Sequence, residues 1–316
     1  MNDGKFKTVA KGLIKLIPYV ENVIPSKRVT GGTDESRYCY SVWLRHLHFW
    51  NNHREGVPSS IAELGPGDSL GTGLAALLSG SNYVFALDVI KFWDSDRNLN
   101  IFNELVELFK KREDIPDQVE FSKVVPTLNN WKFPSHVLTD SLLKESLAED
   151  RLNAIRKELK DIDNPDNKFI KYKIPWNHKD VIAHNELDFV FGQGTLQHID
   201  DLDNCFHTMN LWMKPNGLMA HTVELKSLGL TNSWNGHWTY PDWQWKIIRG
   251  NKPFLINRQP FSTYVKMHDK HGFKLLEEQP IKSENTLKRS QLNSKFKNLS
   301  EDDLTTSLAY MIAVKL

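Results

Sequence analysis

The sequence has few of the features that assign a chain to a special class at once. Its 316 residues contain only two cysteines, Cys39 and Cys205, which give neither a disulfide framework nor a metal motif and suit a reducing compartment. No apolar run reaches the roughly 18 residues that a membrane-spanning helix needs, and no signal peptide is evident. The 40 basic and 39 acidic residues leave a net charge of +1, so no overall field attracts nucleic acid. We therefore expect a soluble cytoplasmic protein without a nucleic-acid partner.

The sequence also lacks the motifs of three common kinds of ligand site. The glycine-containing stretch 65–73 has no Gly-Lys-Ser/Thr, which excludes a Walker A loop. A dinucleotide fingerprint needs a third glycine at position 70, where the chain has Leu70. No HxxxH, Cys-His or paired-carboxylate pattern indicates a metal, so we expect none.

What the chain does contain is a strand, a glycine turn, a helix and a second strand. The apolar run Ile61–Leu64 is typical of a buried parallel strand, and Gly71–Leu78 has helix composition. The second apolar run, Tyr83–Leu87, ends at the acid Asp88. Glycine lets the backbone approach a ligand, and an acid at the end of the second strand is placed to bind ribose hydroxyls. This stretch predicts a nucleotide-type site.

The alternation of strands and helices stops after Asp88 and resumes much later. Residues 94–168 are long for one connection and are predicted to form a mostly helical insertion, either a lid or acceptor wall or a structural elaboration. Further strands are predicted at Phe169–Ile174, Leu187–Phe191, Leu218–Val223, Lys274–Glu277 and Ala309–Val314, with a helix over Asp201–Met213.

Four motifs, in order, resemble those of class I S-adenosylmethionine-dependent methyltransferases. They are Glu63-Leu64-Gly65-Pro66-Gly67, Leu187-Asp188-Phe189-Val190 followed by Leu196-Gln197-His198-Ile199, Trp212-Met213-Lys214-Pro215-Asn216-Gly217, and His271-Gly272-Phe273. The resemblance implies an α/β, Rossmann-like sheet that is mostly parallel with an antiparallel last strand. It also implies an N-terminal helical extension (1–57) covering the cofactor side, a methyltransferase domain (58–316), and insertions at about 94–168 and, for the acceptor, 226–262.

The resemblance further implies which residues hold S-adenosylmethionine. They belong to the glycine turn and to the ends of neighbouring strands: Glu63, Gly65, Pro66, Gly67, Asp68, Ser69, Asp88, Val89, Trp176, Gln193, Gly194 and Leu196. The turn would approach the methionine end, Asp88 the ribose, and Gln193 and Leu196 the sulfonium. Ser69 replaces a glycine common in the family. Ile170 and Lys171 stand where an acid near the adenine is usual, which leaves Trp176 or backbone groups to recognise that ring.

Methyl transfer to a hydroxyl needs a base that takes up its proton. Ligands of open α/β sheets bind at the carboxyl ends of the strands, so the base should follow the fourth or fifth strand. The candidates by position are His198, His221 and Glu224, with His237 from the next segment. His221 and Glu224 lie three residues apart, so a continuous strand would point them to opposite faces.

The clearest clue to the acceptor is a tryptophan-rich stretch at 233–245, which holds four of the ten tryptophans. Tryptophan faces stack on rings and sugars, and nearby arginines can bind a carboxylate or phosphate. The predicted acceptor contacts are Trp234, His237, Trp238, Tyr240, Arg249 and Arg258. The alternative is an aromatic satellite core under a long loop.

Two stretches, Tyr40–Leu47 and Gly236–Trp238, also resemble bacterial methyltransferases associated with surface-polysaccharide biosynthesis. That resemblance implies O-methylation of a sugar, a nucleotide-sugar or another small polar acceptor. A catalytically inactive cofactor-binding partner in a biosynthetic complex is the second hypothesis. An NAD-dependent oxidoreductase is the third, which Leu70 and the closing antiparallel strand disfavour.

The N-terminal residues 5–17 alternate lysines with apolar residues at helical spacing. Such a helix either packs on the domain or lies on an anionic membrane surface, which would place the protein at the inner membrane face.

Overall fold

Seven strands form one sheet in the order β3-β2-β1-β4-β5-β7-β6. The computed structural model describes residues 32–316 except 177, 251, 253, 254 and 285. The strands are β1 (Ser60–Leu64), β2 (Tyr83–Leu87), β3 (Ile170–Lys173), β4 (Leu187–Gln193), β5 (Met213–Glu224), β6 (Phe273–Lys282) and β7 (Thr306–Lys315). The first five are parallel, and β7 runs antiparallel between β5 and β6. The predicted sheet and its antiparallel last strand are confirmed.

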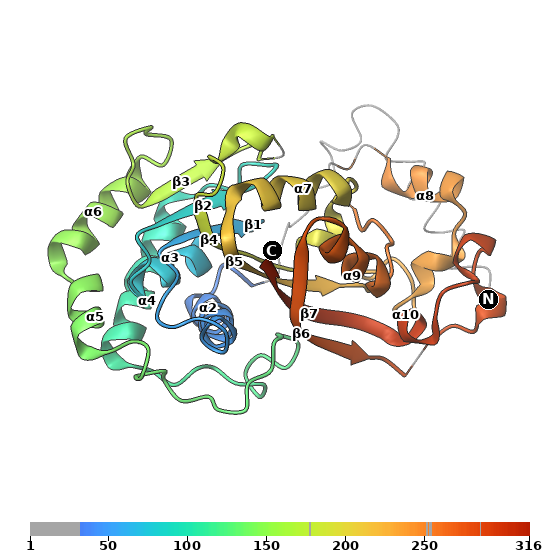
Figure 1. The fold of residues 1–316 in the computed structure, drawn as a ribbon, viewed down its shortest axis with the longest axis horizontal. Coiled ribbons are helices and arrows are strands. Elements are labelled where there is room, and N and C mark those ends of the chain that lie inside the picture. Colours follow the sequence, from blue (N-terminus) through green and yellow to red (C-terminus); the bar gives the residue numbers. More distant parts are fainter. Residues whose placement is uncertain (1–31, 177, 251, 253–254, 285) are drawn as a thin grey trace.

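The inner strands are largely apolar and mostly buried because helices cover both faces of the sheet (Figure 1). The helices are α2 (Ser36–Asn51), α3 (Gly71–Leu78), α4 (Ser95–Lys111), α5 (Asp140–Ser146), α6 (Glu149–Lys160), α7 (Leu202–Trp212), α8 (Asp242–Arg249), α9 (Phe261–Lys270) and α10 (Glu301–Thr305). Short 3₁₀ turns are η2 (Lys179–Val181), η3 (Leu196–His198), η4 (Gly236–Thr239), η5 (Arg289–Gln291) and η6 (Ser294–Phe296).

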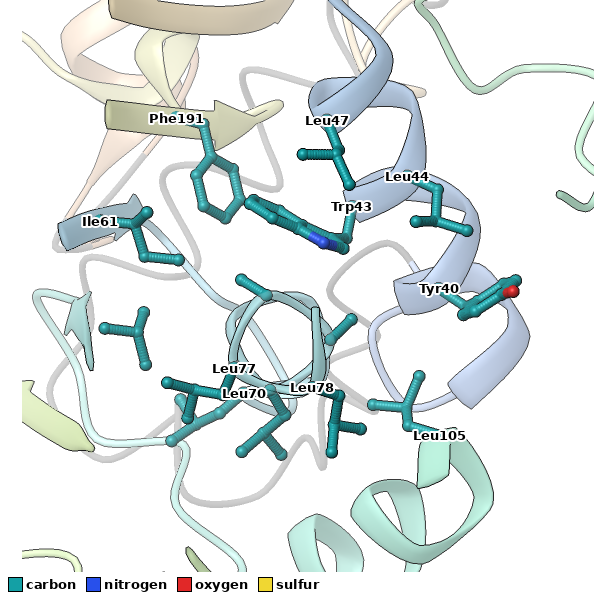
Figure 2. Close-up of a cluster of buried hydrophobic side chains, with 14 of the residues drawn as sticks. Tyr40, Trp43, Leu44, Leu47, Ile61, Leu70, Leu77, Leu78, Leu105 and Phe191 are labelled. Atoms are coloured by element: carbon teal, nitrogen blue, oxygen red, sulfur yellow. The ribbon is translucent and has the colours of Figure 1, made fainter. Parts of the chain in front are cut away.

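The larger core lies between the sheet and helices α2 to α6. Figure 2 shows Trp43 of α2 between Phe191 of β4 and helix α3. Its indole Nε1 donates a 2.7 Å hydrogen bond to Ser79 Oγ at the end of α3. The second core lies on the opposite face, where α7 and α9 pack. Both faces of α3 are buried, so it lies between the sheet and α2.

The insertion at 94–168 is only partly helical. Helix α6 packs against β3 and α4, and α5 packs against α3, but residues 112–139 between α4 and α5 form an irregular segment. This segment passes alongside α2 and reaches β6, where the Thr127 backbone N–H donates to Gln279 Oε1 at 3.3 Å (Figure 1). Its route depends on contacts with distant residues, which local sequence composition does not encode.

The membrane-surface hypothesis concerns residues 5–17, which lie outside the described residues. Among the helices that the structure describes, none combines the length and the apolar character needed to cross a bilayer. The division into an N-terminal extension, a domain over 58–316 and two insertions stays a prediction.

Candidate functional site

A cavity of about 1150 Å³ opens at the carboxyl ends of β1, β2, β4 and β5. This is where open α/β sheets bind ligands. The predicted residues that line it are Glu63, Gly65, Gly67, Asp88, Val89, Trp176, Gln193, Gly194, His198, Glu224 and Arg249. Most of the predicted cofactor residues therefore meet in one space, and two of the four candidate bases share it.

The glycine turn needs its glycines for conformation and for space. Gly65 and Gly67 have φ angles of 66° and 78°, which L-residues with side chains rarely adopt. A Cβ on Gly65 would lie 2.6 Å from Thr195 Oγ1, and that hydroxyl donates to the Leu64 carbonyl at 2.7 Å. The turn is thus fitted against the loop that follows β4, and its backbone faces the cavity.

Not every residue of the turn reaches the cavity. Ser69 is buried behind it, where its Oγ donates to the Thr33 carbonyl and accepts from the Gly71 N–H at 3.0 Å. Asp68 is also buried, and its backbone N–H donates to Thr33 Oγ1 at 2.8 Å. Neither of these residues nor Pro66 is on the lining. The structure therefore places these three residues of the turn behind the cavity and not on its surface.

Glu63 is the most perturbed acid of the site. Its side chain is buried at the end of β1, and its Oε2 accepts a 3.0 Å hydrogen bond from the Gly73 N–H in the first turn of α3. Burial raises the pKa of this carboxyl from 4.5 to about 8, against the opposing effect of the hydrogen bond from Gly73. A buried carboxyl that lines a cavity beside a helix N-terminus is suited to a cationic ligand group.

Asp88 marks the other end of the predicted cofactor site. Its Oδ1 accepts hydrogen bonds from the Val89 and Ile90 N–H groups at 2.7 and 3.2 Å. Burial still raises its pKa above the ordinary value. Val89 and Trp176 flank it on the lining, so apolar surface lies beside the acid. The β3 residue Lys171 instead reaches over the Tyr83 and Phe85 rings, 4.7 and 4.8 Å from their centroids.

The loop after β4 is placed by side chains from elsewhere. Asn257 Nδ2 donates to the carbonyls of Leu196 and Ile199 at 3.0 and 2.7 Å, and its backbone N–H donates to the Gln197 carbonyl at 2.7 Å. These bonds turn Gln197 and His198 to the cavity. Leu196, expected at the sulfonium, is fully buried in the second core and does not line the cavity.

The four candidate bases separate by burial. His198 and Glu224 line the cavity; burial lowers the pKa of His198, and Glu224 pairs with Lys226 at 3.4 Å. His221 is fully buried and off the lining, because the two-residue period of β5 turns it to the face opposite Thr222 and Glu224. His237 is also buried away from the cavity, and burial lowers its pKa to about 3. Neither of these two histidines is placed to act as the base.

Two of the four tryptophans of this stretch, Trp238 and Trp245, are buried in satellite cores and Trp234 packs beside one, whereas Trp243 is 61% exposed and lies off the cavity lining. Trp238 is fully buried, stacks on Phe296 and donates from Nε1 to the Arg258 carbonyl at 2.9 Å. Arg258 is buried, pairs with Asp242 and donates to the Tyr240 carbonyl at 2.8 Å. The acceptor residues expected here and absent from the lining are Trp234, His237, Trp238, Tyr240 and Arg258. Only Arg249 reaches the cavity, where it pairs with Asp200 at 2.6 Å.

Sequence reasoning missed a second wall of the cavity. Tyr38, at the start of α2, lines it and meets Phe121 of the irregular segment edge-to-face at 5.6 Å. Residues 120–124 complete this wall. No motif marks residues 120–124. The N-terminal extension was expected on the cofactor side, but its Tyr40 and Trp43 are part of the core. Among the described residues, no cluster of His, Cys, Asp or Glu could hold a metal ion.

The strand order, with an antiparallel strand between β5 and the edge strand, decides the fold. The chain has the Rossmann-like fold of class I methyltransferases. No protein-family model matches the chain, and no curated protein matches it either.

Several solved structures are similar to the chain at low sequence identity. An S-adenosylmethionine-dependent methyltransferase from Mesorhizobium loti is 14% identical, covers 82% of this chain and 92% of its own, and has a TM-score of 0.41. Another from Methanosarcina mazei is 11% identical, with coverages of 85% and 97% and a TM-score of 0.45. A structure from Galdieria sulphuraria, provisionally described as that of a sarcosine dimethylglycine methyltransferase, is 11% identical, covers 91% of this chain and 91% of its own, and has a TM-score of 0.45. Similarity this low transfers neither activity nor substrate, so the function is argued from the cavity.

Proposed function

We propose that this protein transfers a methyl group from S-adenosylmethionine to a hydroxyl of a small polar acceptor. The observation that carries the proposal is the single cavity in which Glu63, the glycine turn and Asp88 meet His198 and Glu224. A donor site and a candidate base in one space satisfy the main need of methyl transfer, which is to hold two reactants close and aligned.

The residues present fit this cofactor. Glu63 offers a buried carboxyl for its ammonium group, Gly65 and Gly67 leave room for its methionine end, and Asp88 offers a carboxylate for the ribose hydroxyls. Trp176 and Val89 supply apolar surface for the adenine. When bound, S-adenosylmethionine supplies a methyl group on a positively charged sulfur.

His198 is the proposed base. Because burial lowers the pKa of its imidazole, the neutral form that can accept a proton predominates at pH 7. It would take up the proton of the acceptor hydroxyl as that oxygen forms its bond to the methyl carbon and the carbon–sulfur bond breaks, which would release S-adenosylhomocysteine. Glu224, also on the lining, is the second candidate.

The acceptor class rests on the sequence resemblance. A sugar or nucleotide-sugar, as in surface-polysaccharide biosynthesis, is the class that the stretch Tyr40–Leu47 implies. The tryptophans of 233–245 do not support it, because none of them lines the cavity. The wall of Tyr38 and Phe121 offers the aromatic surface instead.

Calorimetry with S-adenosylhomocysteine tests the assignment of the cofactor. The reaction is tested by incubating the protein with S-adenosylmethionine and a sugar, a nucleotide-sugar or an amine, and detecting S-adenosylhomocysteine by mass spectrometry. The Asp88→Ala variant should lose most of its affinity for S-adenosylhomocysteine. The control variant Asp163→Ala changes an exposed aspartate paired with Lys91 and should bind as tightly as the wild type. Unchanged binding in Asp88→Ala would exclude the cofactor assignment. Binding without turnover on every acceptor would favour an inactive cofactor-binding partner, and thermal stabilisation by NAD alone would favour an oxidoreductase.

A further inference from the structure

Arg45, in the middle of α2, carries a fully buried guanidinium group. Its Nη1 donates to the carbonyls of Val124 and Pro126 at 2.6 and 2.9 Å, and its Nη2 donates to the Pro116 carbonyl at 3.2 Å. The group also lies 4.6 Å from the centroid of the Trp131 ring. No ion pair joins Arg45 to a carboxylate within the part of the chain that the structure describes.

Burying an unpaired charge costs free energy unless polar groups replace its water. Here three backbone carbonyls of one segment do so, and desolvation lowers the pKa of Arg45 only to about 10, so the group stays charged at neutral pH. The planar guanidinium can serve several carbonyls at fixed angles, which an ammonium group cannot. The contact therefore fixes the course of residues 116–126, which lie in no helix or strand.

The same residues form a wall of the cavity. Next to the carbonyls that Arg45 binds, the Val125 carbonyl accepts hydrogen bonds from Gln193 Nε2 at 3.1 Å and from Thr222 Oγ1 at 3.2 Å. These donors stand at the ends of β4 and β5. The segment is thus held by α2 on one side and by the sheet on the other.

The wall borders the methionine and acceptor end of the proposed site. Phe121 meets Tyr38 edge-to-face, and Tyr38 lines the same cavity as Glu63 and Glu224. We propose that Arg45 is a positioning residue that holds residues 116–126 as the wall of the cavity at this reacting end. The ligand side of this inference rests on the proposed function, but the contact itself does not.

The test compares Arg45→Lys, which keeps the charge but not the fork of donors, with Arg112→Lys, at a surface arginine paired with Asp140. Hydrogen exchange followed by mass spectrometry reports the order of residues 116–126. Calorimetry with S-adenosylhomocysteine and with adenosine reports the two ends of the site. We expect faster exchange at 116–126, S-adenosylhomocysteine binding about tenfold weaker, and adenosine binding changed less than about twofold.

A second variant, Thr222→Val, keeps the branched shape of the side chain but removes one hydrogen bond to the Val125 carbonyl, and should show the same pattern in smaller degree. Equal weakening of both ligands in Arg45→Lys, with faster exchange throughout the sheet, would reduce Arg45 to a general structural role and overturn the inference. The inference would also be overturned if hydrogen exchange at 116–126 in Arg45→Lys were as slow as in the wild type. If the wild-type protein binds neither ligand, the proposed function fails, and the exchange at 116–126 relative to β1 and β4 alone decides the role of Arg45.

Discussion

Glu63 gives the strongest prediction, because its burial couples folding to pH. The carboxyl has an ordinary pKa of 4.5 and a folded pKa of about 8. Between these values it is ionised in the unfolded chain and protonated in the folded one. The folded state then binds more protons, so its stability falls as the pH rises and the loss is complete above about pH 8.

The size of the effect follows from the same two values. At 1.36 kcal/mol for each pKa unit, the difference corresponds to up to about 5 kcal/mol between pH 4.5 and pH 8. Glu63→Gln removes the ionisation but keeps an oxygen that can accept from the Gly73 N–H. At roughly 2 °C for each kcal/mol, the variant should gain up to about 10 °C in Tm over the wild type as the pH rises from 5 to 9.

Thermal unfolding of both proteins across this pH range measures the gain, with Glu104→Gln, an exposed position on α4, as the control. A difference in Tm between Glu63→Gln and wild type that stays constant with pH would refute the reasoning. The ligand adds a second measurement. An ammonium group beside Glu63 favours the carboxylate, so S-adenosylhomocysteine binding near pH 7 should release a proton from the wild type and not from Glu63→Gln, as calorimetry in buffers of different ionisation enthalpy can show.

Three further predictions concern single positions. Gly65→Ala should cost about 1–3 kcal/mol of backbone strain and should also displace Thr195. Gly56→Ala is the control: Gly56 has a φ of 72°, but a Cβ there would have nothing within 4 Å, so this variant should show the strain alone. In a thermal-shift titration, only Gly65→Ala should weaken the binding of S-adenosylhomocysteine. Trp238→Phe should lower the free energy of unfolding in denaturant by about 1–3 kcal/mol and leave ligand affinity unchanged, which a substrate-contacting tryptophan would not do. If His198 is the base, the acid limb of kcat should have its midpoint below pH 6.5, and His198→Asn should abolish that limb; an unchanged profile in His198→Asn would assign the role to another group.

The fold, and the meeting of Glu63, Asp88 and Gln193 at one cavity, could be predicted because their determinants are local. Each buried strand is a short apolar run beside a turn, and the glycines of 65–67 sit directly after one such run. Since the carboxyl ends of parallel strands meet at one edge, Glu63, Asp88 and Gln193 had to come together once their strands were placed. The alternation of β5 likewise separated His221 from Glu224.

The acceptor end could not be predicted in the same way. Whether Trp238 faces a ligand or a core depends on Phe296, far along the chain, which covers it. Tyr38 and Phe121 meet only because the irregular segment passes alongside α2. Aromatic density predicted that the tryptophans pack against something, but it carried no information about whether that partner is a substrate or the protein itself.

Two buried arginines show which side chains hold the connecting segments around the proposed acceptor end of the cavity. Arg258, expected to bind substrate, instead joins Asp242 and the Tyr240 carbonyl, and Arg45, on a helix expected to cover the cofactor, joins the carbonyls of the irregular segment. Both guanidinium groups order connecting segments rather than contact the cavity. The proposed donor end of the cavity is formed by the ends of strands and by the glycine turn. The walls at the proposed acceptor end are connecting segments that side chains hold in place. Connections tolerate insertion and substitution far better than strands do, so selectivity for the acceptor can change in this fold without disturbing the site of the donor.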